Sequence, residues 1–374
     1  MEEILTLTSI CEKGILLRSS VENRSVLNWD SPSVEVLFQL LRIALGKEEP
    51  SSLPNDVNWQ EVYDLSLKQD VGAIACDGML ALKECSIDEE LRYKWMGQSM
   101  VIEQKSLARW NLLCQLSDLY AQNGIKTYVL KGFSFASYYQ NPFHRFSTDL
   151  DIFLLEDFEK GNQIVEKIGI KVDRNDSKHS HFTVQGIHVE NHQFCVGLRG
   201  YKNIKSTERY LRSLIREDGI QLEGSKLYKP NWSFNALFFM CHARTHFLIE
   251  GGITLKHVCD WILLRDAGDK LKNLEMFWLV CDRFGLMKFA KAIDGVASYV
   301  EHGMELSDNE RIMIDDILSV KAHRESHNKD EAHLLMIGQM WRNRWKFRAY
   351  SDITATRMIL NYAYGYLFER KPNV

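Results

Sequence analysis

Two carboxylates separated by one apolar residue, Asp149 and Asp151, run into the apolar segment 152–155. This pattern predicts a β-strand with both acids on one face, because successive side chains of a strand alternate between its two faces. At a rise of about 3.3 Å per residue, the two Cα atoms would lie roughly 7 Å apart. Leu150 and Ile152 would point into the core. Such a pair suits two Mg²⁺ ions that stabilise the attacking and leaving oxygens of phosphoryl or nucleotidyl transfer.

A short β-prone run, 127–130, precedes the acids and ends in Lys131-Gly132. Ser134 is a candidate N-cap for a helix over 135–140, and the free N–H groups of a helix N-terminus bind phosphate. Gly132 would let the backbone approach a ligand closely. Lys131 beside that helix start would suit a triphosphate. The alternative for Lys131 is a solvated side chain after a strand.

Arg145 stands in the loop just before the acids. Its fork of donors would match phosphate oxygens. The alternative is that Arg145 pairs with a nearby carboxylate and fixes the loop. We predict phosphate contact, with the structural pairing left open.

Two β-prone runs around Gln185-Gly186 predict a β-hairpin. In its second strand His188, Glu190 and His192 share one face. Glu190 could therefore stand beside Asp149 and Asp151 as a third carboxylate. The alternative for Glu190 is an exposed position on a two-sided hairpin.

The histidines allow several interpretations. His179, His181, His188 and His192 fall within 14 positions, which would suit a zinc site. Only Cys195 stands at a suitable spacing to join them, and the alternation of the hairpin accounts for the clustering, so we favour the hairpin explanation. His192, beside the acids, could contact a phosphate or assist proton transfer.

Polar residues of the C-terminal half are harder to assign. His242, Arg244 and His246 lie on an apolar segment that predicts a helix. They could reach the acidic site or make structural hydrogen bonds. Asp260-Trp261 is better explained by helix capping or packing than by chemistry.

Together these motifs resemble the nucleotidyltransferase superfamily typified by DNA polymerase beta. More closely, they resemble the uncharacterised nucleotidyltransferases found largely in bacteria. In that family a Lys-Gly ends the first strand, an Arg precedes an Asp-x-Asp, and a hairpin strand carries a Glu-x-His. The matching residues here are Lys131-Gly132, Arg145, Asp149 with Asp151, and Glu190 with His192. The resemblance continues through His242-Ala243-Arg244 to Asp260-Trp261 and covers roughly residues 90–270. The usual Gly-Gly or Gly-Ser pair of the superfamily is replaced by Lys131-Gly132.

The resemblance implies a Mg²⁺-dependent enzyme that moves a nucleoside monophosphate from a nucleoside triphosphate to an acceptor hydroxyl. It implies that Asp149, Asp151 and Glu190 are catalytic and hold two Mg²⁺ ions. The expected nucleotide contacts are Lys131, Gly132, Ser134, Arg145 and His192. A catalytically inactive nucleotide-binding regulatory module is the alternative function. A helical interaction protein with incidental acids is the third possibility.

The bulk composition limits the acceptor. The chain has 374 residues, of which 45% are hydrophobic and 26% charged, which excludes wholesale disorder and allows two or three domains. A net charge of −4 provides no general basic field for nucleic acid. A small-molecule or protein acceptor is therefore favoured over RNA.

Several features favour a cytoplasmic protein without a membrane partner. The start Met1-Glu2-Glu3 lacks the basic and apolar regions of a signal peptide. No apolar run approaches the roughly 20 residues needed to span a bilayer. The eight cysteines show no Cys-x-x-Cys spacing, so we expect reduced thiols.

The predicted fold class is α+β. Helices are expected at 34–45, after the cap Ser31 and Pro32, and over 59–84 and 88–123, where Gly124 ends the last one. The β-containing core over 126–200 should hold the strand at 127–130, a helix, the acidic strand, a helix over 155–168, a short strand at 170–172 and the hairpin. Helices and loops should follow. We therefore expect an N-terminal helical region at 1–88, a nucleotidyltransferase-like core with a small mixed sheet at 89–200, and a C-terminal helical domain at 201–374.

Overall fold

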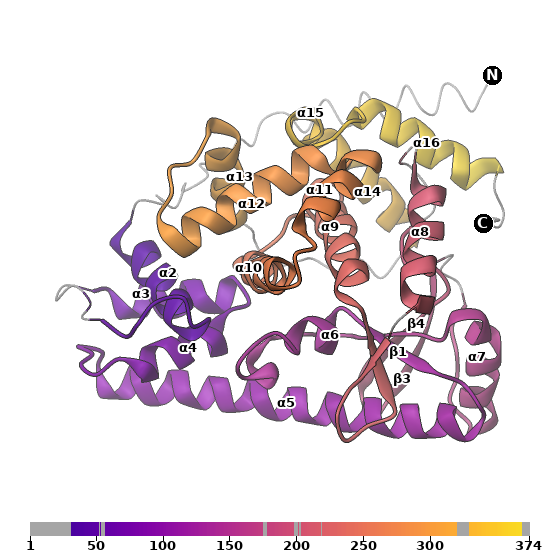
Figure 1. Ribbon diagram of the computed structural model, residues 1–374, viewed down its shortest axis with the longest axis horizontal. Helices are drawn as coiled ribbons and strands as arrows, with labels where there is room; N and C mark the ends of the chain where they lie inside the picture. The colour runs from indigo at the N-terminus through magenta and orange to yellow at the C-terminus, as the bar shows by residue number, and fades with distance from the viewer. Residues whose placement is uncertain are drawn as a thin grey trace.

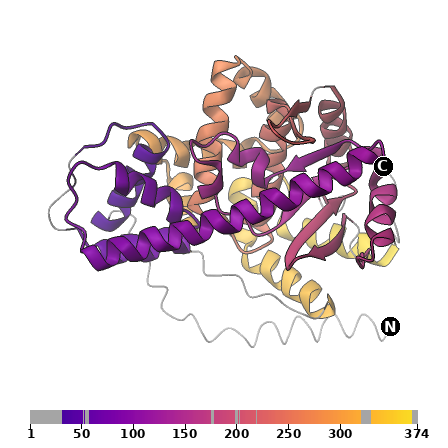
Figure 2. The same ribbon diagram turned by 90° about the horizontal axis from the view of Figure 1, so that it is seen from below.

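In the computed structural model, a long helix, α5 (Glu89–Gln122), extends along one side of the protein (Figures 1 and 2). It begins beside the N-terminal helices and ends beside the central sheet. Asp88 caps its start by accepting hydrogen bonds from the backbone N–H groups of Glu90 and Leu91. Gly124 adopts a φ of +73° just after its end, as a terminating glycine does. The helix therefore connects the N-terminal region to the sheet.

The structure describes residues 31–51, 53, 57–174, 178–197, 201, 203–217, 219–319 and 329–368. The strands are β1 (Thr127–Leu130), β2 (Leu150–Phe153), β3 (His179–Val184), β4 (Ile187–His192), β5 (Gly219–Gln221) and β6 (Leu227–Pro230). The other helices are α2 (Pro32–Ala44), α3 (Trp59–Lys68), α4 (Gly72–Ala81), α6 (Gly132–Ala136), α7 (Phe158–Lys167), α8 (Ile204–Glu217), α9 (Trp232–Leu248), α10 (Leu255–Lys270), α11 (Leu274–Arg283), α12 (Met287–His302), α13 (Asp308–Ser319), α14 (Lys329–Arg342), α15 (Arg344–Tyr350) and α16 (Ala355–Phe368), with 3₁₀ turns η1 (Pro142–His144) and η2 (Leu155–Asp157).

The six strands form one mixed sheet in the order β3-β4-β2-β1-β6-β5. β2 pairs with β1 antiparallel and with β4 parallel, while β1 pairs with β6 parallel. The hairpin β3–β4 forms one end of the sheet, so β3 is an edge strand. This topology, with helical regions before and after the sheet, confirms the α+β fold class.

Each face of the sheet packs against a different set of helices. On one face, Ile152 and Val189 pack with Leu112 and Leu116 of α5 and with residues of α7. On the other face, Phe153 belongs to the core of the helices that follow the sheet, and the guanidinium of Arg212 on α8 lies 5.1 Å from its ring centroid. Side chains that alternate with Ile152 and Val189 therefore face α8 and α9.

Several predicted elements are confirmed. β1 occupies 127–130, and Leu150 and Ile152 are buried as expected. Ser31 caps α2, and Pro32 is its first residue. The hairpin turn is Gln185-Gly186, whose φ values of +52° and +77° suit a type I′ turn.

Other predicted elements are wrong. Residues 170–172 form no strand, and the nearby Asp173 makes only an isolated bridge to His181. Residues 219–230, expected to lie in a region of helices and loops, contain β5 and β6, which extend the sheet beside β1. The segment expected as one helix over 59–84 is two helices, α3 and α4.

The length and polarity of the helices and the state of the cysteines are defined for the described residues. None of the helices in the described ranges is long and apolar enough to cross a membrane. The cysteines in those ranges are free thiols, and most are buried. Cys11 lies outside the described residues.

Candidate active site

The register of the sheet places three ionisable side chains in one row across neighbouring strands. Asp151 on β2 lies opposite Glu190 on β4, and Glu190 lies opposite His181 on β3. Neighbouring strands are about 4.8 Å apart, so side chains in such a row come within reach of one another. Because these positions alternate with Ile152 and Val189, the row faces α8 and α9.

Asp149 stands just outside this regular arrangement. It precedes β2, which begins at Leu150, so the expectation that both acids lie within the strand is wrong for Asp149. Its carboxylate accepts a hydrogen bond from the hydroxyl of Thr148 at 3.0 Å. Burial raises the pKa of Asp149, and the charges of Glu190 and Asp151 raise it further. The three carboxylates therefore lie within electrostatic reach of one another.

Lys131 joins the site directly from the end of β1. Its Nζ lies 2.6 Å from Oδ1 of Asp151. Its backbone adopts a φ of +44° and ψ of −131°, a region that non-glycine residues rarely occupy. Backbone strain of this kind costs about 1–3 kcal/mol and is concentrated at functional sites. The strained turn directs the ammonium group towards the carboxylates.

His192 orients Asp151 from the neighbouring strand. Its Nε2 lies 2.8 Å from Oδ1 of Asp151 and 3.4 Å from Oε2 of Glu190, and its Nδ1 lies 3.2 Å from the carbonyl oxygen of Phe194. The ring is fully buried. Both nitrogens thus face oxygen acceptors, which holds the imidazole in one orientation behind the carboxylates.

The two acids in the row are held in their ionised form. Burial opposes ionisation of Asp151, but Lys131 and the hydrogen bond with His192 lower its pKa below the ordinary value. For Glu190, burial is likewise outweighed by the hydrogen bond with His192 and the charges of Lys131 and His179, so its pKa is strongly lowered. Ionised carboxylate oxygens are the ligands that Mg²⁺ prefers. The donor set of Asp149, Asp151 and Glu190 therefore suits such an ion.

The role expected for Ser134 as a helix N-cap is wrong. α6 begins at Gly132, and the N-cap position is Lys131. Ser134 lies inside this five-residue helix, fully buried, and its hydroxyl donates to Oδ1 of Asn235 on α9 at 2.9 Å. Gly132 has a φ of +24° and is buried directly after Lys131. Ser134 therefore anchors α6 to α9.

Arg145 makes a bidentate ion pair with Asp260 of α10. Its Nε and Nη2 donate to the two carboxylate oxygens at 2.7 and 2.6 Å, and both side chains are buried. The hydroxyl of Tyr139 donates to the same carboxylate at 2.8 Å. Burial of Arg145 lowers its pKa, but the charge of Asp260 outweighs this effect and raises it overall. The structure thus contains the carboxylate pairing that was the alternative for Arg145, and Asp260 lies within α10 rather than at its cap.

Two further cationic or titratable groups lie near the row. Burial lowers the pKa of Lys178, just before β3, and the positive charge of Lys131 lowers it further. Burial and the charge of Lys131 also lower the pKa of His242 on α9. Sequence reasoning did not single out Lys178, although its position next to the histidines of the hairpin was a usable signal. Arg244 instead donates to the carbonyl oxygen of Gly285 at 3.0 Å.

The mixed sheet, the Lys-Gly turn and the clustered carboxylates define a class: an α+β protein with an acidic site on one face of its sheet. The chain belongs to a family described as uncharacterised nucleotidyltransferase, whose model matches residues 55–297. The match covers well over half of the chain and includes every candidate site residue. No curated protein matches the chain significantly, and no solved structure does either. Membership of this family confirms the resemblance and supports nucleotidyl transfer in general terms.

Proposed function

We propose that the protein moves a nucleoside monophosphate from a nucleoside triphosphate to an acceptor hydroxyl, with two Mg²⁺ ions held by Asp149, Asp151 and Glu190. The observation that carries this proposal is the pairing of Asp151 with Glu190 across β2 and β4, with Lys131 in contact with the same site. Bound Mg²⁺ would neutralise phosphate charge and lower the pKa of the acceptor hydroxyl.

The protein's own residues would position and neutralise the reactants. Lys131 supplies a cation for the triphosphate from a turn that is already ordered. Lys178, whose pKa is lowered by burial and by the charge of Lys131, also interacts electrostatically with Glu190 and Asp151. His192 keeps Asp151 oriented, which limits reorganisation when the nucleotide binds. Positioning and charge neutralisation provide most of the catalysis in reactions of this class.

The reaction balances simply. The acceptor hydroxyl transfers its proton to solvent water, and its oxygen bonds to the α-phosphorus. The bond between that phosphorus and the oxygen bridging to the β-phosphorus breaks, and pyrophosphate leaves. Lys131 would stabilise the negative charge that develops on the leaving pyrophosphate. Arg145 has no assigned part in this step, because both oxygens of Asp260 already engage its donors.

The net charge of the protein bears on the class of acceptor. A net charge of −4 favours a small molecule or a protein over RNA. The helices of the C-terminal half, which pack over the face of the sheet that carries the site (Figure 1), would form the wall against which the acceptor lies.

Transfer of label from α-labelled nucleotides tests this function. Each nucleoside triphosphate is incubated separately with Mg²⁺, the protein and a cell extract, and labelled products are separated. The control protein carries Asp149→Asn and Asp151→Asn. Label that moves with wild type but not with the control supports the proposal, and its carrier identifies the acceptor class. Mg²⁺-dependent nucleotide binding without transfer would favour the inactive nucleotide-binding module. If neither occurs, nucleotidyl transfer is excluded.

A further inference from the structure

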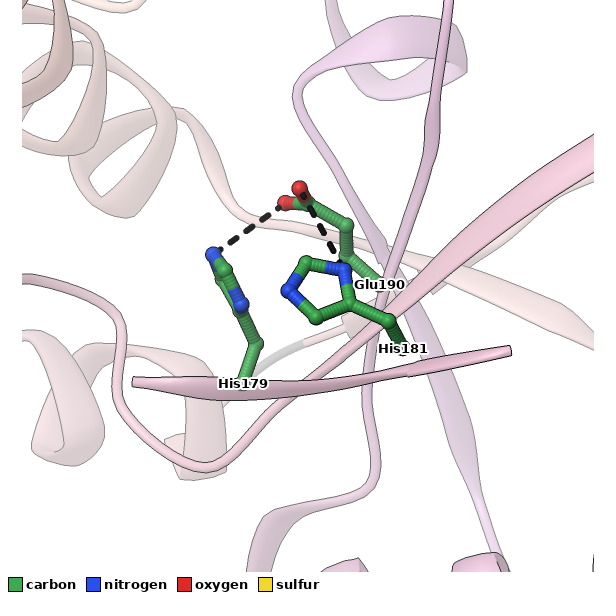
Figure 3. Close-up of side chains that lie close together, drawn as sticks. All are labelled: His179, His181 and Glu190. Atoms are coloured by element: carbon green, nitrogen blue, oxygen red, sulfur yellow. Dashed lines mark ion pairs between the residues drawn. The ribbon is translucent and has the colours of Figure 1, made fainter. Parts of the chain in front are cut away.

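The hairpin carries two imidazoles that the proposed function does not use. His179 and His181 project from edge strand β3 towards the carboxylate of Glu190 on β4 (Figure 3). The ring centroids of the two histidines are 4.4 Å apart. All three side chains are partly buried, with 14%, 25% and 17% of the side-chain surface exposed. They are sheltered by the fold yet within reach of a small ion.

The distances within this cluster differ from those of hydrogen bonds. Nε2 of His179 lies 3.5 Å from Oε2 of Glu190, and Nδ1 of His181 lies 3.9 Å from Oε1. Hydrogen bonds between nitrogen and oxygen span about 2.7–3.2 Å. Tetrahedral zinc, with ligand bonds of about 2.0–2.2 Å, places its ligand atoms about 3.3–3.5 Å apart. The spacing is therefore closer to that of ligands around one ion, although some closing movement of His181 is required.

His181 adds a second observation. Its Nδ1 is buried and makes no hydrogen bond. A buried polar atom without a hydrogen bond is costly, and such an atom calls for an explanation such as an ion. The lone pair of a neutral imidazole nitrogen is a metal ligand. One ligand atom each from His179, His181 and Glu190 lies within 4.8 Å of the others.

We propose that His179, His181 and Glu190 form a binding site for one transition-metal ion, with zinc as the expected species. Imidazole nitrogens favour zinc and similar ions over Mg²⁺, which takes oxygen ligands. Two histidines and one glutamate leave a fourth position for water or a ligand oxygen, as in catalytic zinc sites. The site shares Glu190 with the proposed magnesium site but does not depend on nucleotidyl transfer.

The structure also offers a competing ligand set. Asp151, Glu190 and His192 likewise place one ligand atom each within 4.8 Å of the others. In that set, however, Nε2 of His192, which would be its nitrogen ligand, already faces Oδ1 of Asp151 at 2.8 Å. His192 therefore directs its Nε2 at a hydrogen-bond partner, whereas Nδ1 of His181 has none. The pair of hairpin histidines is the better choice.

Cobalt titration of the full-length, metal-free protein tests the site, because Co²⁺ replaces zinc and absorbs visible light in a tetrahedral environment. We expect one equivalent to bind with visible absorption and without a thiolate charge-transfer band, since the ligands are nitrogen and oxygen. Zn²⁺ should then displace it, as followed by calorimetry. His179→Ala and His181→Ala should each weaken binding by about 100-fold or more.

Matched variants make each outcome decisive. His188→Ala is the control, because His188 lies on the same hairpin, with its ring stacked 5.6 Å from His181, but outside the ligand set. It should bind like wild type. Asp149→Asn should abolish nucleotidyl transfer yet keep Co²⁺ binding, which separates this site from the proposed function. No binding to wild type, binding unaffected by His179→Ala and His181→Ala, or binding lost with His192→Gln alone would overturn the proposal.

Discussion

Two clusters of charge in this protein, one partly buried and one buried, have similar residue types but different ratios of acids to cations. At the sheet, Lys131 contacts Asp151, and His192 contacts Asp151 and Glu190. Asp149 interacts electrostatically with the other two acids and with Lys131, so three acids surround one contacting lysine. Between the loop after η1 and α10, Arg145 and Asp260 pair one to one.

The different ratio of acids to cations indicates a structural role for the Arg145–Asp260 pair and a binding role for the sheet cluster. In the Arg145–Asp260 pair, each carboxylate oxygen accepts from the guanidinium, and Tyr139 completes the cluster. No electrostatic demand remains for a ligand. At the sheet, burial raises the pKa of Asp149, and the charges of Glu190 and Asp151 raise it further. Three carboxylates around one contacting lysine favour a further cation, so we propose the sheet cluster, and not the Arg145 cluster, as the binding site.

Asp151→Asn provides the largest expected effect. Nucleotidyl transfer should fall by about 10³-fold or more, because a central charged ligand is replaced by a neutral amide. Initial rates with each labelled nucleotide measure the loss, and circular dichroism checks that the fold is retained. Asp157→Asn, at a half-exposed carboxylate in η2, is the control and should keep full activity. Equal rates for the two variants would remove Asp151 from the mechanism.

Asp260→Asn should act on stability instead. It leaves the guanidinium of Arg145 buried without a counter-charge, so the free energy of unfolding should fall by about 3–5 kcal/mol. Urea unfolding measures this change. Asp269→Asn, at an exposed position on the same helix, should cost less than about 1 kcal/mol. Unchanged stability together with lost nucleotide affinity would instead assign Arg145 to the phosphates.

His192→Gln should weaken the sheet site without destroying it. The partners that orient metal ligands typically contribute about 10–100-fold to metal affinity. The Mg²⁺ concentration required for half-maximal transfer should rise by that factor, while the rate at saturating Mg²⁺ changes less. His188→Gln, at an exposed position on the same strand, is the control. A fall in the saturated rate with an unchanged Mg²⁺ requirement would indicate that His192 acts on the substrate.

Lys131→Gly and Lys131→Ala separate two effects at the sheet site: the loss of the positive charge and the relief of backbone strain. Both variants lose the ammonium group, so both should lose nucleotide affinity. The glycine variant should be the more stable by about 1 kcal/mol, because glycine accepts the positive φ without a steric penalty. Thermal or urea unfolding measures the difference. At Lys160 in α7 the order should reverse, since alanine is favoured in a helix. An alanine variant as stable as glycine would show that the turn is unstrained.

The loop that carries Arg145 should also contain a small pH-dependent contact. Nδ1 of His144 lies 2.8 Å from Oδ2 of Asp77. Burial lowers the pKa of His144, but the hydrogen bond and charge of Asp77 raise it above the ordinary value overall. Because the folded pKa is raised, the stabilisation is fully present below about pH 6.5 and is lost as pH rises through the folded pKa.

His144→Asn measures this contribution. The difference in unfolding free energy between wild type and His144→Asn should be about 1 kcal/mol or less at pH 6 and should shrink towards pH 9. The destabilisation by Asp260→Asn should stay constant over the same range, because Arg145 remains charged. A difference for His144→Asn that grows with pH would show that the imidazole is stabilised in its neutral form.

Local signals predicted much of the fold and part of the site. The alternation around Gln185-Gly186 defined the hairpin, because two positive φ values at a two-residue turn require such residues. β5 and β6 were missed, because they include Gly219, Lys229 and Pro230, residue types that are depleted in strands. Their pairing with the sheet comes from the contact of β6 with β1, a non-local interaction.

The sequence by itself determined which groups are available: the two acids, the Lys-Gly turn, and a hairpin strand with a glutamate and histidines on one face. These are properties of residue type and local spacing, and local conformation follows from them. Only the tertiary structure decided which groups meet. Glu190 stands beside Asp151 because β4 pairs with β2 in that register, whereas Arg145 meets Asp260 across 115 positions of sequence. The strand register and the contacts between distant residues depend on how the helices pack on the sheet. The spacing of residues along the chain does not predict that packing.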